Sequence, residues 1–308
     1  MKQRWHIPAA LLLLFLLLLL LGHSVFVRET MEQALSLCAH CVIPSLFPFL
    51  AASSLLLSLG VQELAAPFLA AWFEPLFRVR GEGAAAFLLG LIGGYPIGAR
   101  TAAELYQHQR LTRAETERLL HFCNNSNPVF LLSVLGTGVF GSLRIGLWLW
   151  LIHLAAALLT GLCFRGNGRE PYPQSPRPIQ APPPLPDFPS AFVSAVNSAL
   201  SAILTICAFV SCFYLLSAPL SRLGAVSPWL VGSLELFSLT PLLSPTPLSF
   251  LLASTAAGWG GLSVLFQTAA LLSGSGLSLR PCLTGKALQA LFSGLLALLL
   301  IPSLFLSC

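Results

Sequence analysis

Long apolar runs separated by short polar stretches make up most of this chain, and many of the apolar runs have the length of a membrane span. The first, residues 7–27, is almost uninterrupted leucine, and about 20 apolar residues carry a helix across the hydrocarbon core. A basic start before an apolar run is also typical of a signal peptide, but this run is longer and no A-x-A cleavage site follows it. Residues 1–28 are therefore expected to form a transmembrane helix, and Lys2 and Arg4 favour a cytoplasmic N-terminus.

Proline and charge modify the apolar runs that follow. Residues 29–60 contain Pro44 and Pro48 within an apolar run, a pattern that predicts a kinked or re-entrant helix. Residues 62–80 carry charges around an apolar face and predict an interfacial helix or hairpin. The further apolar runs are also expected to be helical, and they cover residues 82–110, 129–143, 145–164, 188–221, 249–272 and 287–305.

A proline-rich stretch divides the chain. Residues 166–187 contain eight prolines with Arg, Gln and Ser between them, and such a sequence cannot form a packed core, so it predicts an extended linker. We therefore expect an all-α polytopic transmembrane bundle with two halves, residues 29–165 and 188–308. Each half is expected to contain broken or re-entrant helices.

The first half holds a cluster of helix-breaking residues inside an apolar run. Gly93, Gly94, Tyr95, Pro96 and Gly98 lie close together, and in a helix interior glycine costs roughly 1 kcal/mol and proline about 3 kcal/mol relative to alanine. The helix is expected to open here and to expose backbone amides and carbonyls. At membrane depth such backbone is tolerated only where it is buried in protein or lines a watery cavity, so these residues are candidate solute ligands.

Four small polar residues at positions 124–127 interrupt the next part of the chain. Asn124, Asn125 and Ser126 can bond to donors and acceptors without carrying charge, which suits a site for a polar solute. The same residues also fit a turn at the end of a helix, because asparagine is favoured in the left-handed conformation. Both interpretations stay open from the sequence.

Charged residues near these segments are few. Arg100 and Glu104 lie four residues apart, so they share a helix face and can pair. Arg100 is either a snorkelling anchor or part of a route for an anionic solute, whose carboxylate its guanidinium would bind. Thr112, with Glu115 three residues later, has the pattern of a capping box. Glu235 stands alone in an apolar stretch, which indicates a functional carboxylate unless it lies at the membrane interface.

The block GGYPIGAR…TAAELY…LTRAETERLLHFCNNSNPVF, which ends at Phe130, resembles the core of the sporulation integral membrane protein family. That family carries the nucleoside-recognition, or Gate, domain and is linked to dipicolinate transport during endospore formation. A second matching block runs from Gly258 to Val264. The family commonly has a histidine after this block, where the present chain has Leu265, and Gln267 is retained. The resemblance covers nearly the whole chain after the first segment and implies two Gate-like halves.

The second half loosely repeats the theme of the first. Glycines at positions 258, 260 and 261 interrupt the run 249–272, and two interrupted apolar segments in corresponding halves are typical of a transporter with a midplane site. We expect the solute to bind where the two breaks approach each other. Its expected ligands are Gly93, Gly94, Tyr95, Pro96, Gly98, Arg100, Asn124, Asn125, Ser126, Gly260, Gly261, Ser263 and Gln267.

The composition argues against several other classes of protein. Hydrophobic residues make up 56% of the chain and charged residues 9%, against about 25% charged in ordinary soluble domains, so contact with a lipid bilayer is expected. Nucleic-acid binding is not expected, because it needs clustered Lys and Arg. The eight cysteines mostly lie in apolar runs, and the Cys38-x-x-Cys41 spacing lacks the further ligands of a metal site. No cofactor and no enzyme activity are expected, since no Ser/His/Asp, HExxH or paired-carboxylate arrangement appears.

The function expected from these residues is that of a membrane transporter or channel for a small polar or anionic solute. The resemblance implies that the solute is dipicolinate, moving from mother cell to forespore, and that the chain is a multi-pass protein of the outer forespore membrane. Two alternatives stay open: a transporter for a nucleoside or other metabolite, and a non-transporting sporulation membrane scaffold. Association into a homo-oligomer and the coupling ion also stay open.

Overall fold

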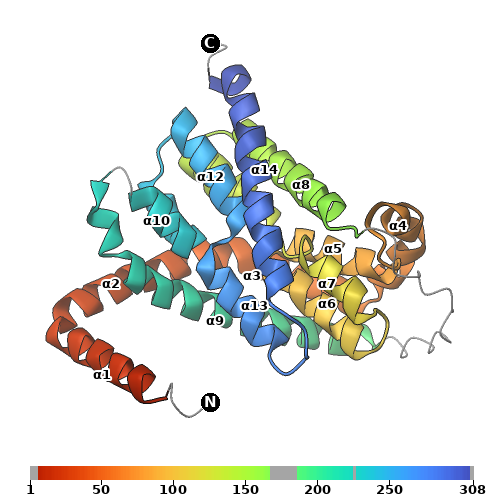
Figure 1. The fold of residues 1–308 in the computed structure, drawn as a ribbon, viewed down its shortest axis with the longest axis horizontal. Helices are drawn as coiled ribbons and strands as arrows, with labels where there is room; N and C mark the ends of the chain where they lie inside the picture. Colours follow the sequence, from red (N-terminus) through yellow and green to blue (C-terminus); the bar gives the residue numbers. More distant parts are fainter. Residues whose placement is uncertain (1–5, 167–185, 225–226, 306–308) are drawn as a thin grey trace.

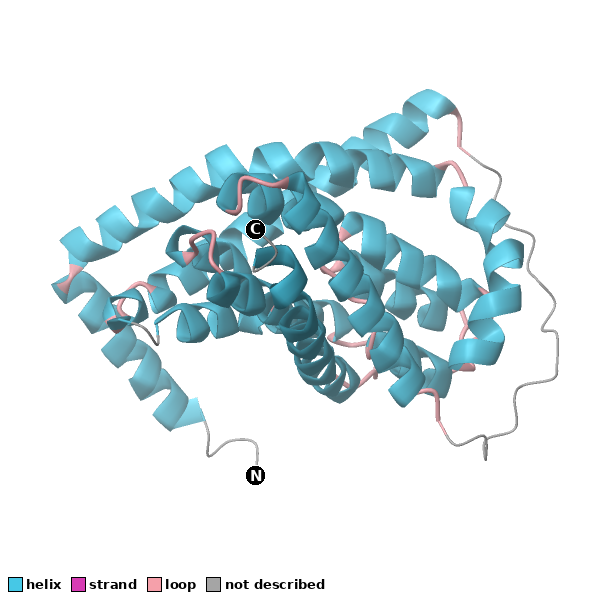
Figure 2. Ribbon diagram, turned by 90° about the horizontal axis from the view of Figure 1, so that it is seen from above, coloured by secondary structure: helices cyan, strands magenta, loops and turns pink. Residues whose placement is uncertain are grey.

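The computed structural model describes residues 6–166, 186–224 and 227–305, and these residues form helices and loops without any strand (Figure 2). Five helical stretches are long and apolar enough to cross a membrane: Ser24–Leu56, Leu143–Cys163, Phe188–Ser217, Pro247–Leu272 and Arg280–Phe305. The predicted all-α polytopic fold is confirmed.

The N-terminal apolar run forms two helices instead of one. Helix α1 (His6–Gly22) ends at His23, whose backbone angles (φ −115°, ψ 35°) leave the helical region, and α2 (Ser24–Leu37) continues in a new direction (Figure 1). The predicted single span over residues 7–27 is therefore wrong. A glycine followed by two polar residues weakens the leucine helix at this point.

The predicted kinked or re-entrant helix at residues 29–60 belongs to one long helical run. Helix α2 passes through a π-helical turn (Cys38–Val42) into α3 (Ile43–Ser58). The irregular turn directly precedes Pro44, which has no amide hydrogen to donate back along the helix. Ser24–Leu56 has the length and apolar composition of a full span, and the re-entrant interpretation stays a prediction that the structure does not test.

Helix α3 packs along α9 (Phe188–Ser217), so residues from the two halves of the chain lie side by side. The contact surface consists of buried side chains about four residues apart on each helix, a spacing that keeps them on one face. These residues are Cys38, Val42, Leu46 and Leu50 on one side and Ala199, Ile203, Ile206 and Val210 on the other.

Four further helices follow α3 in the chain. They are α4 (Val61–Phe77), α5 (Glu82–Gly93), α6 (Ile97–Gln107) and α7 (Arg113–Leu120). The predicted interfacial segment at residues 62–80 is mostly the single helix α4 and not a hairpin. Thr112 and Glu115 form the capping box at the start of α7, which confirms that prediction.

Helix α14 (Arg280–Phe305) packs against α8 (Leu143–Cys163) and α12 (Pro247–Trp259) (Figure 1). A π-helical segment, η3 (Phe130–Val139), precedes α8. The other elements are η4 (Leu220–Arg222), α10 (Ser227–Leu234), α11 (Leu236–Leu239), η6 (Thr240–Leu242) and α13 (Gly261–Leu272). The last helix begins at Arg280, so the predicted start of the last span at residue 287 is wrong.

The predicted proline-rich linker at residues 166–187 falls almost entirely on residues 167–185, which lie outside the described residues. The division of the chain into two halves at this linker stays a prediction.

A buried ion pair fixes α7 to the loop before α5. Arg80 Nη2 lies 2.9 Å from Glu115 Oε2, and the backbone N–H and the hydroxyl of Thr112 donate to the same carboxylate at 2.8 and 2.7 Å. Burial on its own raises the pKa of Glu115, but the hydrogen bonds from Arg80 and Thr112 outweigh burial and leave that pKa below its ordinary value. Folding therefore favours the charged form of this carboxyl group.

Replacing this carboxylate tests the ion pair. We expect Glu115→Gln to lower the free energy of unfolding by roughly 3 kcal/mol at neutral pH, because it leaves a largely buried guanidinium without its counter-charge. A carboxyl group with a lowered pKa stabilises the fold above its unfolded pKa of about 4.3. That stabilisation is lost as the pH falls through the folded pKa, so the difference between variant and wild type should shrink in acid. Thermal unfolding of the full chain in detergent measures both effects.

The matched control is Glu117→Gln, which removes the same charge from an exposed pair with Arg113 on the same helix. Equal unfolding temperatures for Glu115→Gln and Glu117→Gln would show that the buried pair does not stabilise the fold.

Candidate functional site

Two helices are interrupted at the glycine-rich segments, as the sequence predicts. The first break is the non-helical segment 94–96 between α5 and α6, and the second break is Gly260 between α12 and α13. Gly94 and Gly260 both have positive φ angles, of 81° and 82°, which glycine adopts without steric cost. The bond between Tyr95 and Pro96 is a cis peptide bond.

Tyr95 joins the two breaks. Its hydroxyl group donates a hydrogen bond of 2.7 Å to the carbonyl oxygen of Ala257, in the last turn of α12. A side chain at Gly260 would lie 3.1 Å from the Tyr95 ring and hydroxyl, so the second break lies directly against this tyrosine. The two breaks therefore meet, although more than 160 residues separate them in the chain.

The predicted polar residues at positions 124–127 form the turn that follows α7, and they are also buried. Asn127 donates from Nδ2 to the carbonyl oxygens of Ile92 and Gly93, at 3.1 and 3.2 Å, and so satisfies backbone acceptors at the C-terminal end of α5. Asn124 donates to Thr268 Oγ1 at 3.0 Å, which ties the turn to α13. The segment is therefore a buried turn, although none of its asparagines has the left-handed conformation. A role of these residues in binding a solute stays a prediction.

Glycine at positions 90 and 98 lets this turn approach the first break. A Cβ atom at Gly90 would lie 1.8 Å from the carbonyl oxygen of Cys123, and one at Gly98 would lie 1.9 Å from the same atom. No side chain fits at such distances. The close contact between α5, α6 and the 123–127 turn therefore requires glycine at both positions.

Lys286 on α14 lies behind the first break, and sequence inspection did not select it. Its side chain is among the largest that are fully buried in the described part of the chain. Nζ donates to Gln289 Oε1 at 2.9 Å, to the carbonyl oxygen of Asn124 at 3.0 Å and to the Tyr95 hydroxyl at 3.3 Å. It also lies 4.8 Å from the centre of the Tyr95 ring.

The hydrogen-bond pattern suits a charged Lys286. The Tyr95 hydroxyl donates its hydrogen to the carbonyl oxygen of Ala257, so it can only accept a hydrogen bond from Lys286. The carbonyl oxygen of Asn124 can only accept, and Gln289 presents Oε1 because its Nε2 donates to Asn125 Oδ1 at 3.0 Å. Three acceptors need three donor hydrogens, which an ammonium group has and a neutral amine does not.

The positive charge of Lys286 has no acidic partner in the described part of the chain. The five ion pairs found there involve other residues. A buried charge without a counter-charge is costly, even when hydrogen-bonded. The site therefore has a surplus positive charge where the two breaks meet.

Arg100, which the sequence analysis selected as the counter-charge for an anion, lies elsewhere. Its guanidinium pairs with Glu104 at 2.9 Å, as the spacing predicts, and about half of each side chain is exposed. Arg100 is not among the residues that line the space between the breaks.

A small cavity of about 40 Å³ lies against the first break and against α13, the helix that follows the second break. Its apolar wall consists of Leu46, Phe130, Ile206, Val210, Leu236, Phe237 and Val264, and its other wall consists of Gly93, Tyr95, Ser126, Asn127, Glu235, Ser263 and Gln267. A cavity needs roughly 10–15 Å³ of this kind of volume to hold one water molecule, whereas pockets for organic ligands measure about 300–1,000 Å³. The cavity in this conformation is therefore the size of water or a small ion, and an organic solute needs the site to open.

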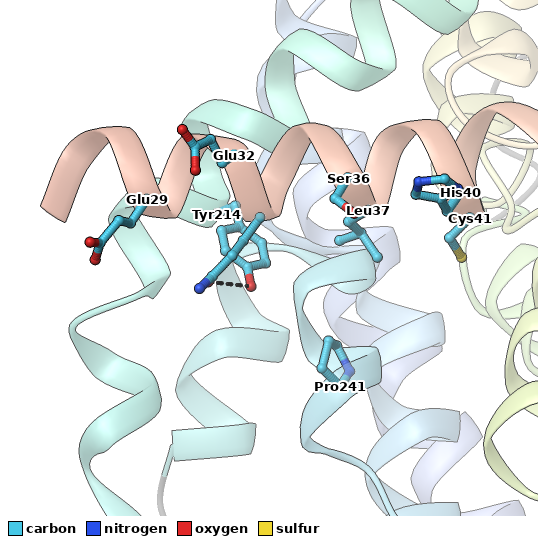
Figure 3. Close-up of a pocket in the computed structure, with 9 residues that line it drawn as sticks. Glu29, Glu32, Ser36, Leu37, His40, Cys41, Tyr214 and Pro241 are labelled. Carbon is cyan, nitrogen blue, oxygen red and sulfur yellow. Dashed lines mark hydrogen bonds between the residues drawn. The ribbon is translucent and has the colours of Figure 1, made fainter. Parts of the chain in front are cut away.

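A wider hollow of about 620 Å³ lies along α2 and α9, away from the breaks (Figure 3). Glu29, Glu32, His40, Tyr214 and Pro241 are among the residues around it. It is open, and none of the predicted solute ligands lines it. The convergent buried polar groups lie at the breaks, so we take the breaks as the candidate site.

Several residues of this site were missed because their signal in the sequence is faint. His153 on α8 accepts a hydrogen bond of 3.0 Å from the backbone N–H of Ser126, and Gln289 connects this region to Lys286. The available signal was a lysine with a glutamine three residues later in an apolar helix. An ionisable residue inside a span indicates function, but placing the start of the last span at residue 287 left Lys286 outside it.

Comparison with known proteins gives one informative likeness. The chain is 28% identical, over 333 aligned positions, to the protein "Sporulation integral membrane protein YlbJ" of Bacillus subtilis (strain 168). The alignment takes in 95% of this chain and 82% of that protein. No family model matches the chain, so the predicted Gate domains stay a prediction. No solved structure matches either.

The likeness and the helices agree on a coarse description. The chain is a multi-pass membrane protein homologous to a sporulation membrane protein.

A substitution at Gly90 tests the close approach at the first break. We expect Gly90→Ala to destabilise the protein by about 1–3 kcal/mol or more, because the added methyl group overlaps the Cys123 carbonyl oxygen. The control is Gly22→Ala, where no atom lies within 4 Å of the added carbon. Thermal unfolding in detergent measures both variants, and an unfolding temperature for Gly90→Ala equal to that of the control would contradict the packing described here.

Proposed function

We propose that this protein is a membrane transporter that moves a small anionic solute through the region where the two breaks meet. The observation that carries the proposal is Lys286, a fully buried ammonium group that hydrogen-bonds only to neutral oxygens. Because the breaks expose backbone groups of two different helices beside it, the region can offer both charge and hydrogen bonds to a passing solute.

The sign of the charge supports an anion over a neutral solute. An anionic carboxylate near Lys286 would supply the counter-charge that the described residues do not, and charge-assisted hydrogen bonds are roughly twice as strong as neutral ones. A neutral solute would leave the ammonium group uncompensated. Binding of an anionic solute would then offset the free-energy cost of burying Lys286 without a counter-charge.

The solute we propose is dipicolinate, a flat aromatic dianion, moving from mother cell to forespore across the outer forespore membrane. The similarity to a sporulation membrane protein supports this setting. Tyr95 offers an aromatic face on which a flat ring can stack, while the amides of Asn124 and Asn125 are buried nearby. The aromatic face of Tyr95 suits an aromatic dicarboxylate better than an aliphatic one.

A nucleoside is the second candidate, and the uncharged amides around the turn favour it. Asn124 Oδ1 has no hydrogen-bond partner among the described residues, and such an amide suits recognition of a base or a sugar hydroxyl. Uptake of labelled dipicolinate and of a labelled nucleoside, each measured with the other in excess as competitor, separates the two candidates. Saturable uptake of dipicolinate that nucleoside does not inhibit supports the first, and saturable uptake of nucleoside without uptake of dipicolinate supports the second.

Removing the buried charge tests the proposal. We expect Lys286→Gln to reduce dipicolinate uptake by at least about tenfold in proteoliposomes that contain the purified full chain, because the solute loses its buried counter-charge. The unfolding temperature should change little, since glutamine keeps a donor and the uncompensated charge is removed. A purely structural lysine predicts the reverse, a lower unfolding temperature with transport retained per folded molecule.

The matched control is Arg100→Gln, which removes a positive charge from an exposed pair. Uptake by this variant should stay close to that of the wild type. Transport lost in Arg100→Gln and kept in Lys286→Gln would move the anion site to Arg100 and refute the proposal.

A further inference from the structure

Glu235 is a second buried charge-bearing residue at the breaks. Its side chain lies between α10 and α11, is 3% exposed, and belongs to none of the ion pairs in the described part of the chain. Oε2 accepts hydrogen bonds from the backbone N–H and the hydroxyl of Ser238. Burial raises the pKa of Glu235 above its ordinary value, and the hydrogen bonds from Ser238 offset this only in part. An ionised Glu235 therefore needs a positive charge beside it, which no ion pair in the described part of the chain supplies.

The second break holds Glu235 in place. A side chain at Gly261 would lie 2.9 Å from the carbonyl oxygen of Leu234 and 3.2 Å from the Cα atom of Glu235. The α10–α11 junction therefore packs directly on the start of α13. Glu235 and the α13 residues Ser263 and Gln267 line the same small cavity.

Gln267 provides an independent sign of a missing ligand. Its side chain is 4% exposed and lines the cavity. Nε2 donates to Ser263 Oγ at 3.2 Å, which leaves Oε1 as the free end of the amide, and Oε1 has no hydrogen-bond partner among the described residues. A buried acceptor without a partner is rare in folded proteins and indicates an ion or water that completes it.

We infer that the cavity between Glu235, Ser263 and Gln267 is a binding site for one sodium-sized monovalent cation. One carboxylate surrounded by neutral oxygens balances a single positive charge, whereas a divalent ion would leave a net charge buried. No group of three or more His, Cys, Asp or Glu side chains in the described part of the chain could hold a transition metal or divalent ion. The volume of about 40 Å³ admits a small ion and excludes organic cations.

The position of Tyr95 connects this site to Lys286. Tyr95 lines the cavity, and its ring and hydroxyl contact Lys286 Nζ. A cation in the cavity and an anion at Lys286 would thus share one aromatic side chain as their common neighbour. We take this cation to be the coupling ion for transport. That role rests on the proposed function, whereas binding of the cation to the cavity does not.

Equilibrium binding of radioactive sodium to the purified full chain in detergent, without any solute, tests the site. We expect saturable binding by the wild type, and an affinity at least about tenfold lower for Glu235→Gln and for Gln267→Leu. The control is Glu104→Gln, which removes an exposed carboxylate of the same charge, and it should bind as the wild type does. If Glu235→Gln fails to fold because Glu235 caps α11, Gln267→Leu decides, since Gln267 caps no helix.

The absence of saturable sodium binding by the wild type would overturn the inference, and so would wild-type affinity in a folded Gln267→Leu variant. Dipicolinate uptake in sodium or choline buffer separates this inference from the proposed function. Uptake without sodium binding removes the cation site and leaves the transporter. Sodium binding without uptake of any tested anion leaves the site and removes the proposed transport.

Discussion

The candidate site is organised around one constraint, the need to satisfy a buried ammonium group with backbone and side-chain oxygens. Lys286 lies on α14, but its hydrogen-bond acceptors come from the first break, the 124–127 turn and its own helix. A regular helix uses its own carbonyls and has none to offer. The interruption of α5–α6 and the close approach of the turn to it therefore provide what the buried charge requires.

The same interruptions provide the proposed route for the solute. Gly90 and Gly98 allow the Cys123 carbonyl to approach within distances that no side chain would permit, and Tyr95 connects the first break to the end of α12. Glu235 lies at a further interruption, against Gly261. Two buried ionisable residues thus lie at neighbouring interruptions, with Tyr95 contacting Lys286 and lining the same cavity as Glu235. Because the cavity is the size of water or a small ion, the proposed passage of an organic solute requires Tyr95 or its neighbours to move.

The sequence predicted the features that follow from local chemistry. Some features depend only on the backbone conformation of a few neighbouring residues, so a short stretch of sequence is enough to predict them. These are the glycines and proline of the first break, the glycine at position 260 and the capping box of Thr112. The boundary at His23 and the unbroken run through Pro44 were missed, because tertiary packing decides how much irregularity a helix tolerates. Lys286 was missed for another reason: its partners lie 162 and 191 residues away in the chain. As a cationic residue, Arg100 looked equally suitable as a ligand for an anion, and only the fold shows that its side chain is half exposed and paired with Glu104.

The most direct test of this account is an experimental structure of the full chain with dipicolinate bound, determined in a lipid nanodisc. The account predicts that a carboxylate of the solute lies within about 4 Å of Lys286 Nζ, the range of an ion pair, with Tyr95 displaced from its contact with Ala257. A bound solute at Arg100 or in the open hollow beside α2, with Lys286 still enclosed by its three neutral acceptors, would contradict it.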